Sequence, residues 1–409
     1  MEASVKDASG ARTIGLRELV VTSIQKNTKQ YTMFLALIAI WVIFAFLTDS
    51  VFLTARNLSN LFVQTVTTAI LAIGMVLVIV AGHIDLSVGS VLGFTGAVCA
   101  MCMIKLEWGV VPSVLATAAM GLAIGAWHGF WVAYRKVPAF IVTLASMLAF
   151  RGLIIGITGG QTQGLEMAPE KAASAFKLIG QGYLPTILTA AEGRVHDTSL
   201  YASIALIVIF IVTRLRKRAA RIKYGFEVPP MYGELLGLAI MSALMGTFAM
   251  LMVVYLGIPW SVIFVLALAV LFSFIANDTT FGRHLYAIGG NPDAARLSGI
   301  NVRRNTFGLF LLMGLMTALA GIVYTSRLNA ATTSAGQNAE LDAIAAAVIG
   351  GTSLMGGEGT IYGAIIGALV MTSLDNGMSL MNLDITFQYV IKGLILLLAV
   401  WVDMAQRKK

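Results

Sequence analysis

Long apolar runs separated by short polar stretches occupy most of this chain. Several of the runs reach the roughly 20 residues that an α-helix needs to cross the hydrocarbon core of a bilayer. The strands of a membrane barrel would alternate apolar and polar residues, and these runs do not. The sequence therefore predicts an all-α, polytopic helical membrane protein with about 11 to 12 spans, at about residues 31–48, 60–81, 91–104, 110–133, 139–158, 199–213, 234–256, 259–276, 306–325, 341–356, 361–381 and 386–402. The run 341–356 is expected to cross either wholly or as paired half-helices.

Two glycine-rich segments, residues 82–90 and 350–359, interrupt this pattern and predict broken helices. The first places Asp85 within a membrane segment, where an ionisable residue costs about 2.5–3.5 kcal/mol, so Asp85 is expected to face protein or a water-filled cavity. Two interpretations remain open. Asp85 lines a cavity for a polar solute, or it caps the following helix by accepting its amides. The candidate pathway-lining residues are His83, Asp85, Ser87, Gly89 and Glu358.

The polar segment 281–304, FGRHLYAIGGNPDAARLSGINVRR, contains a short helix with its own end signals. Asn291 has a side-chain oxygen that suits an N-cap, and Pro292 suits the first helical position. Gly299 supplies the left-handed residue that commonly ends a helix. We predict about two turns, from Pro292 to Ser298. Because so short a helix is marginal on its own, it is expected to rest against another surface.

The distribution of basic residues predicts which ends of the spans face the cytoplasm. Six Lys and Arg residues lie together within residues 214–223 with no acid among them, and the positive-inside rule places such clusters in the cytoplasm. Counting the spans alternately from a cytoplasmic N-terminus agrees with this placement, and no cleavable signal peptide is expected. The predicted organisation is a cytoplasmic tail at 1–30, a single transmembrane domain at 31–403 and a basic tail at 404–409, with a periplasmic loop at 159–198, a basic cytoplasmic loop at 214–233 and a second cytoplasmic loop at 281–304.

Composition narrows the possible functions. Of the 409 residues 58% are hydrophobic and only 12% are charged, about half of the charged share in a soluble domain. The net charge of +8 does not indicate nucleic acid, because the positive charges lie next to membrane spans. Cys99 and Cys102 form one C-x-x-C inside an apolar run, where packing is the simpler interpretation. The chain has no G-x4-G-K-[ST], H-E-x-x-H or G-x-S-x-G motif, so we expect no catalytic, cofactor or metal site, and ATP-driven transport would need a separate ATPase.

Four stretches carry a resemblance to a known family: VIVAGHIDLSVGS (78–90), VPAFIVTLASMLAFRGL (137–153), residues 281–304 and IGGTSLMGGEGT (349–360). Together they resemble the permease subunit of bacterial monosaccharide ABC importers, which handle ribose, xylose, arabinose and galactose. The resemblance runs from about residue 31 to the C-terminus, first to the multiple-monosaccharide branch and second to the xylose branch. It implies a multi-pass permease of the bacterial inner membrane, which is not an enzyme. It also implies that residues 281–304 form a coupling segment, with the ATPase-coupling residues Gly289, Gly290, Asn291, Pro292, Ala295, Arg296, Ser298 and Gly299.

The partners follow from the same resemblance. It implies a cytoplasmic ABC ATPase subunit, a periplasmic sugar-binding protein and a permease homodimer in membrane lipid, with no nucleic acid and no cofactor. In the implied mechanism, closure of the ATPase pair pushes on residues 290–299 and switches a cavity between inward and outward access. The alternative is an ion-coupled secondary sugar transporter that uses Asp85, His83 or Glu358 as its ion site. In that case an uncoupler would stop uptake while ATP persists.

Overall fold

The computed structural model describes residues 28–187, 196–226, 228 and 231–407 of the chain. Most of the predicted tail 1–30 and the last two residues of the predicted tail 404–409 therefore lie outside the described residues. The chain divides into two compact units: Met1–Thr32 with Leu184–Ile258, and Met33–Tyr183 with Pro259–Lys409.

Two long helices, α8 (Asp197–Lys223) and α9 (Met231–Val254), pack against each other in the first unit. Both carry apolar runs long enough to cross a membrane. The sequence predicted a span ending near residue 213 and a basic loop at 214–233. Residues 214–223 are not a loop, because α8 continues without interruption to Lys223. Arg and Lys are good helix formers, so the basic residues form the last turns of the helix.

The second unit is built almost entirely from helices. Two short strands, β1 (Gln163–Gly164) and β2 (Ala330–Ala331), pair antiparallel within it. The other elements in chain order are α2 (Thr28–Leu47), which belongs to this unit from Met33 on, η1 (Val51–Leu53), α3 (Ala55–Val80), α4 (Val88–Lys105), α5 (Val110–Gly129), the π-helical turn η2 (Phe130–Tyr134), α6 (Ala139–Thr158), η3 (Leu165–Met167), α7 (Glu170–Gln181), α10 (Trp260–Asp278), α11 (Thr280–Gly290), α12 (Pro292–Leu297), α13 (Val302–Leu328), α14 (Ala339–Ile349), α15 (Ile361–Leu380) and α16 (Ile385–Arg407).

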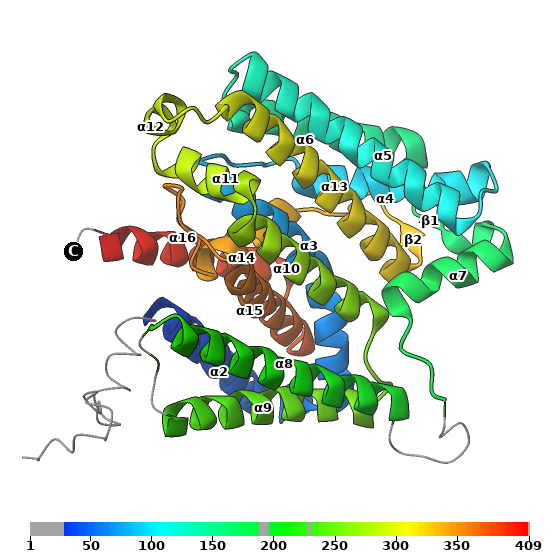
Figure 1. Ribbon diagram of the computed structural model, residues 1–409. Coiled ribbons are helices and arrows are strands. Elements are labelled where there is room, and N and C mark those ends of the chain that lie inside the picture. The colour runs from blue at the N-terminus through cyan, green and yellow to red at the C-terminus, as the bar shows by residue number, and fades with distance from the viewer. Residues whose placement is uncertain (1–27, 188–195, 227, 229–230, 408–409) are drawn as a thin grey trace, which may run out of the picture. The chain divides into compact units, whose positions relative to one another are not determined.

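Helix α3 forms the centre of the second unit (Figure 1). Its side chains from Ile70 to Val80 are almost completely buried, and α13, α15, α14 and α10 all pack against it. A helix that is apolar all round belongs in the interior of a protein. Helices α5, α6 and α10 instead expose much of their apolar surface, which suits helices that face lipid tails.

Helices α5 and α13 approach each other through glycine. A Cβ at Gly314 would lie 2.7 Å from the backbone nitrogen of Gly125, and a Cβ at Gly121 would lie 2.6 Å from the carbonyl oxygen of Gly314. Small residues let membrane helices pack backbone to backbone, where close van der Waals contact replaces the hydrophobic driving force that lipid does not supply. These glycines therefore let α5 and α13 pack backbone to backbone.

Both predicted broken helices are present. The first break separates α3, which ends at Val80, from α4, which begins at Val88. The second follows α14, whose 11 residues span only about 16 Å at 1.5 Å per residue, about half of a 30 Å hydrocarbon core. The run 341–356 is therefore a half-helix followed by a loop. The predicted loop 159–198 also contains structure, including the helix α7.

Nine helices in the described part of the chain are long and apolar enough to cross a membrane, and two shorter apolar helices, Thr32–Leu47 and Ile385–Trp401, join them. This confirms the prediction of an all-α, polytopic membrane protein. The predicted cysteine packing also agrees with the structure, because Cys99 and Cys102 are free and buried.

A pair of asparagines joins α3 to α15 within the membrane segments. Asn57 Nδ2 donates to Asn376 Oδ1 at 2.8 Å, and Asn376 Nδ2 donates back to Asn57 Oδ1 at 3.1 Å. Hydrogen bonds between membrane helices contribute about 0.6 kcal/mol on average and up to about 1.7 kcal/mol. We expect Asn376→Ala to lower the free energy of unfolding in detergent by about 1–2 kcal/mol, because it also leaves the buried side-chain oxygen of Asn57 without its donor. Denaturant titration measures this change. Because Asn57 also donates to the Phe52 carbonyl oxygen, the pair is tested by a double-mutant cycle, and a coupling energy near zero between Asn57→Ala and Asn376→Ala would contradict a paired role.

Candidate coupling site and broken helices

The short helix predicted within the coupling segment is α12, Pro292–Leu297, and it has the expected cap. Asn291 Oδ1 accepts hydrogen bonds from the backbone nitrogens of Asp293 at 3.1 Å and Ala294 at 3.0 Å. Gly299 has a φ of +86°, in the left-handed region that favours glycine after a helix end. The local sequence therefore accounts for both ends of α12.

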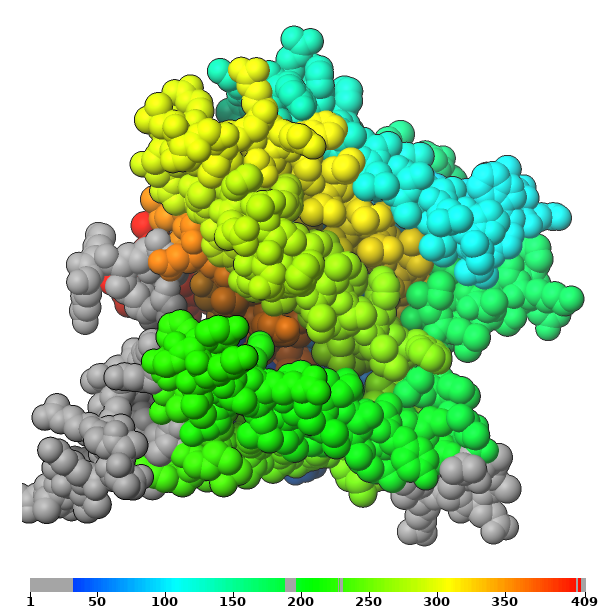
Figure 2. All heavy atoms as spheres, in the orientation of Figure 1, coloured from blue at the N-terminus to red at the C-terminus, as the bar shows by residue number. Residues whose placement is uncertain are grey.

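The outer surface of α12 is open to a partner (Figure 2). Of its six residues only Ala295 is buried, at 4% exposure. The Arg296 side chain is 72% exposed and makes a 3.8 Å ion pair with Asp293, an arrangement that leaves the guanidinium free to exchange partners. Leu297 is 84% exposed. An arginine beside an exposed leucine is a suitable anchor for a protein interface, where arginine is enriched.

Helix α11, Thr280–Gly290, connects α12 to both broken helices. The backbone at Gly289 is so close to α3 that a Cβ there would overlap the carbonyl oxygen of Val80, and it would lie 2.7 Å from the nitrogen of Gly357. That nitrogen donates a 2.8 Å hydrogen bond to the same Val80 oxygen. A Cβ at Gly356 would lie 2.7 Å from the carbonyl oxygen of Gly289. The coupling segment thus contacts the end of α3 and the loop after α14 through backbone atoms.

A tyrosine on α11 adds a side-chain contact to the same loop. The Tyr286 hydroxyl donates a 2.7 Å hydrogen bond to the carbonyl oxygen of Gly359. Burial raises the pKa of Tyr286, so the phenol stays protonated and able to donate at neutral pH. Tyr286 lies three residues before Gly289 and so on the same face of the helix. Tyr286 is not among the residues predicted from the sequence, although its spacing from Gly289 is visible there.

Asp85 is 2% exposed and fixes the turn that precedes α4. Its Oδ1 accepts hydrogen bonds from the backbone nitrogen of Ser87 at 2.8 Å and from the Ser87 hydroxyl at 2.6 Å. Helix α4 begins at Val88, so Asp85 accepts the amide of the residue before the helix. The predicted cap on the amides of the helix itself is wrong. Thr143 of α6 accepts a 3.1 Å hydrogen bond from the nitrogen of Leu86. The break between α3 and α4 is therefore held by Asp85 within it and by Thr143 of α6.

The N-terminus of α4 meets the N-terminus of α14 at Gly89. A Cβ at Gly89 would overlap the carbonyl oxygen of Gly336 and the Oε2 of Glu340. Glu340 is 8% exposed, and its Oε2 has no hydrogen-bond partner among the described residues. Arg151 donates a 2.8 Å hydrogen bond to the carbonyl oxygen of Ala335 nearby. Glu340 was not predicted from the sequence. An acidic residue at the start of a run of small residues, as in ELDAIAAAVIGG from residue 340, was the available signal for it.

The remaining predicted lining residues lie in different surroundings. Glu358 is exposed on the loop that contacts the coupling segment, whereas Asp85 is buried. His83 is half-buried, with its ring 5.8 Å from the ring of Phe310. A pathway-lining role for these residues stays a prediction.

A charged cluster joins the last three helices of the unit. Lys392 Nζ of α16 lies 3.0 Å from Asp342 Oδ2 of α14 and 2.8 Å from Asp375 Oδ1 of α15. The sequence alone does not show that these three residues lie together. The cluster borders a cavity of about 110 Å³, lined by Asn338, Leu341, Asp342, Ala345, Met371, Tyr389, Lys392, Gly393 and Leu396.

Paired broken helices near the middle of a helical membrane protein are typical of transporters. In this chain both breaks contact α11, and α11 leads directly into the exposed, capped helix α12. This combination is that of a multi-pass membrane permease. The chain belongs to the family described as branched-chain amino acid transport system / permease component, whose model matches residues 57–400. This family confirms the prediction of a transport permease and not an enzyme.

The relatives agree with that assignment. The chain is 46% identical to the xylose transport system permease protein XylH of Escherichia coli K12 over 94% of this chain and 93% of that protein. It is 44% identical to XylH of Haemophilus influenzae, over 94% and 98%, and 35% identical to the ribose import permease protein RbsC of E. coli K12, over 86% and 87%. No solved structure matches the chain. The resemblance to monosaccharide permeases is confirmed, with the xylose branch matching better than the ribose branch, and an ion-coupled transporter is not favoured.

Proposed function

We propose that this chain is the permease subunit of an ATP-binding-cassette importer that moves monosaccharides across the bacterial inner membrane. The observation that supports it most directly is the docking of the coupling segment. Helix α12 is exposed, while Gly289 behind it contacts both broken helices. A permease driven by another polypeptide needs a rigid connection of this kind between an exposed surface and the helices that move.

The partners are those of an importer whose ATPase is a separate subunit. The chain has no phosphate-binding loop of its own, so an ABC ATPase docks on the cytoplasmic surface of α12. A periplasmic sugar-binding protein delivers the sugar from the other side, and two copies of the permease form the pathway. The high identity to xylose permeases makes a pentose the first sugar to test.

The mechanism uses the backbone contacts of α11. Closure of the ATPase pair displaces α12, and α11 passes the displacement to Val80 and to the loop at Gly356 and Gly357. Backbone atoms in contact have no rotamers that absorb a push, so the ends of α3 and α14 move with α11. The paired N-termini of α4 and α14, at Asp85 and Glu340, then open toward one side of the membrane or the other.

Arg296 provides the direct test. We expect Arg296→Ala to lower sugar uptake about tenfold or more, because interface arginines often contribute about 2 kcal/mol to a protein contact. ATP hydrolysis by the assembled complex should persist but lose its stimulation by the sugar-loaded binding protein. Both are measured in proteoliposomes that contain the permease, the ATPase and the binding protein.

The matched control is Arg56→Ala, which removes an exposed arginine at the start of α3, away from the coupling segment. It should leave uptake close to that of the unaltered protein. Normal uptake by Arg296→Ala would remove the main residue from the coupling assignment. If no monosaccharide and binding protein stimulate hydrolysis by the unaltered complex, the proposed function itself fails.

A further inference from the structure

The basic end of α8 has no role in the transport mechanism derived above. Six cations lie within its last ten residues, with no acid between them: Arg214, Arg216, Lys217, Arg218, Arg221 and Lys223. Helix ends attract cations through the helix dipole, but that effect falls off within the last turn. The dipole therefore accounts for Arg221 and Lys223 at most, and the cations before them need another partner.

The length of α8 places these cations at the depth of lipid headgroups. Its 27 residues extend about 40 Å at 1.5 Å per residue. A bilayer is about 30 Å thick across its hydrocarbon core and about 40–45 Å thick with its headgroup layers. The 17 residues before Arg214 span about 25 Å of the core, so the basic turns begin near the core boundary and extend through one headgroup layer.

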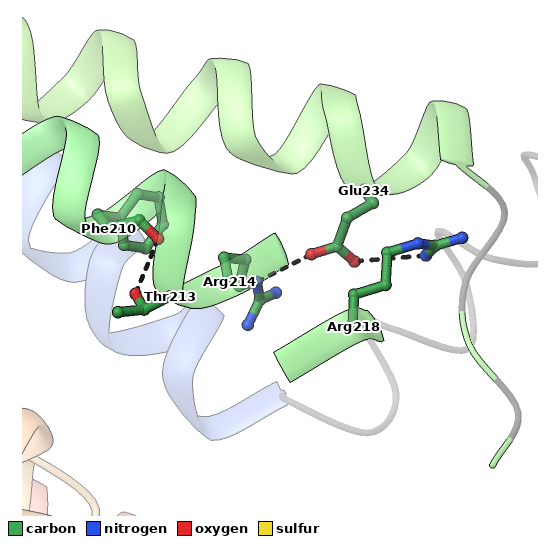
Figure 3. A network of polar contacts seen from close by, with 5 residues as sticks. All are labelled: Phe210, Thr213, Arg214, Arg218 and Glu234. Atoms are coloured by element: carbon green, nitrogen blue, oxygen red, sulfur yellow. Dashed lines mark hydrogen bonds and ion pairs between the residues drawn. The ribbon is translucent and has the colours of Figure 1, made fainter. Parts of the chain in front are cut away.

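One carboxylate of the neighbouring helix is positioned between two of the cations. Glu234 of α9 lies between Arg214 and Arg218 (Figure 3). Its Oε1 is 3.1 Å from Arg214 Nε, and its Oε2 is 4.0 Å from Arg218 Nη1. Arg214 and Arg218 are four residues apart and share one helix face. The α9 side of the basic turns is therefore partly neutralised.

The opposite side keeps its charge. Arg216 and Lys223 are seven residues apart, so they share a face about 200° around the helix from Arg214, and Lys217 lies on the flank between these faces. All three are exposed. No carboxylate of the described residues lies within 4 Å of their charged atoms.

We propose that Arg216, Lys217 and Lys223 bind the headgroups of anionic phospholipids in the leaflet where α8 ends. Clusters of four to eight cations immediately beyond a membrane helix are a typical signal for anionic lipid. Two exposed aromatic residues follow directly, Tyr224 at 73% and Phe226 at 62% exposure. Aromatic side chains are favoured at the level of headgroups, where one end meets lipid and the other meets water.

This binding is separate from the effect of the cations on topology. Positive charge sets the orientation of α8 during membrane insertion, and any cluster of Lys or Arg is enough for that effect. It does not require anionic lipid to stay bound to the folded protein. Lipid binding instead requires that the folded, purified protein retain anionic lipid in preference to zwitterionic lipid. An acidic protein partner is the less suitable occupant, since the cations lie within the headgroup layer.

The test uses the full-length protein purified in an uncharged detergent. It is offered equal amounts of phosphatidylglycerol and phosphatidylcholine, and bound lipids are counted by native mass spectrometry. We expect the unaltered protein to retain phosphatidylglycerol preferentially. The triple variant Arg216→Gln, Lys217→Gln, Lys223→Gln should lose roughly tenfold to a hundredfold of this preference, because each cation at an anionic surface contributes about fivefold before screening by salt.

Two further variants make the result specific. The control Lys105→Gln, Lys171→Gln, Lys177→Gln removes the same charge from exposed positions on α4 and α7 and should keep the preference. The variant Arg216→Lys, Lys217→Arg, Lys223→Arg keeps the charge and should also keep it. If the triple glutamine variant misfolds or inserts in the wrong orientation, as a C-terminal tag assay would report, the single variants Arg216→Gln and Lys223→Gln are measured and should each lose severalfold.

The proposal is overturned if the glutamine variants keep the full preference for phosphatidylglycerol. An equal loss in the α4 and α7 control would also overturn it, since the preference would then follow net charge and not this surface. Neither result bears on the sugar-transport proposal, because the measurement needs no ATPase, sugar or binding protein.

Discussion

Gly289→Ala is expected to stop sugar uptake while the permease still inserts and still binds its ATPase. A Cβ at this position would overlap the carbonyl oxygen of Val80 and lie 2.7 Å from the nitrogen of Gly357. Both obstacles are backbone atoms joined to each other by a hydrogen bond, so neither swings aside as a side chain would. Overpacking of this kind typically costs about 1–3 kcal/mol, which corresponds to roughly 5-fold to 150-fold in the population of the docked conformation.

The neighbouring glycine makes the comparison sharp. A Cβ at Gly290 would meet no atom within 4 Å, yet Gly290 belongs to the same family motif as Gly289. We expect Gly290→Ala to reduce uptake far less than Gly289→Ala, with the ratio of uptake to ATP hydrolysis measured in proteoliposomes. Equal losses at both positions would show that the motif acts through contact with the ATPase and not through the contact with α3 and the loop. Normal coupling in Gly289→Ala would remove the proposed route into the breaks.

The parts of the fold that depend on local chemistry were predictable from the sequence. Apolar run length predicted the spans, and the cap at Asn291 with the left-handed Gly299 predicted α12 to within one residue. The basic end of α8 was misread as a loop, because the change from apolar to charged residues was taken as a helix end. Arg and Lys favour helix about as strongly as Leu, so polarity marked the membrane boundary there and not the end of the helix.

The site depended on contacts between segments distant in sequence, and single-sequence patterns carry no information about those. The glycines of the two breaks were visible, but that Val80, Gly289 and Gly357 share one contact was not. Glycine at a close backbone approach and glycine in a flexible loop look the same in a sequence. Glu340 was missed for a similar reason, since its burial arises from the approach of α4 and α14 and not from its neighbours along the chain.

The largest loss of stability is expected for Lys392→Met. Lys392 is the cation that lies within 3.0 Å of both Asp342 and Asp375, and its removal leaves two carboxylates close together among the helices α14, α15 and α16. Removing one partner of a fully buried ion pair typically costs about 3–5 kcal/mol, because the remaining charge is left uncompensated. The three side chains here are 17–34% exposed, so the expected cost lies at or below the lower end of that range. We expect a much lower yield of folded protein and a lower denaturation midpoint in detergent, measured by size-exclusion chromatography after heating.

Restoring electrical balance should recover most of that loss. Replacing a whole buried ion cluster by neutral residues of similar size is often neutral or even stabilising, so Lys392→Met combined with Asp342→Asn and Asp375→Asn should be far more stable than Lys392→Met alone. If the single variant is as stable as the unaltered protein, both carboxylates are already solvated, Asp342 by water in the adjoining cavity of about 110 Å³. In that case Lys392 does not hold α16 in place, and the cluster belongs to a hydrated part of the permease.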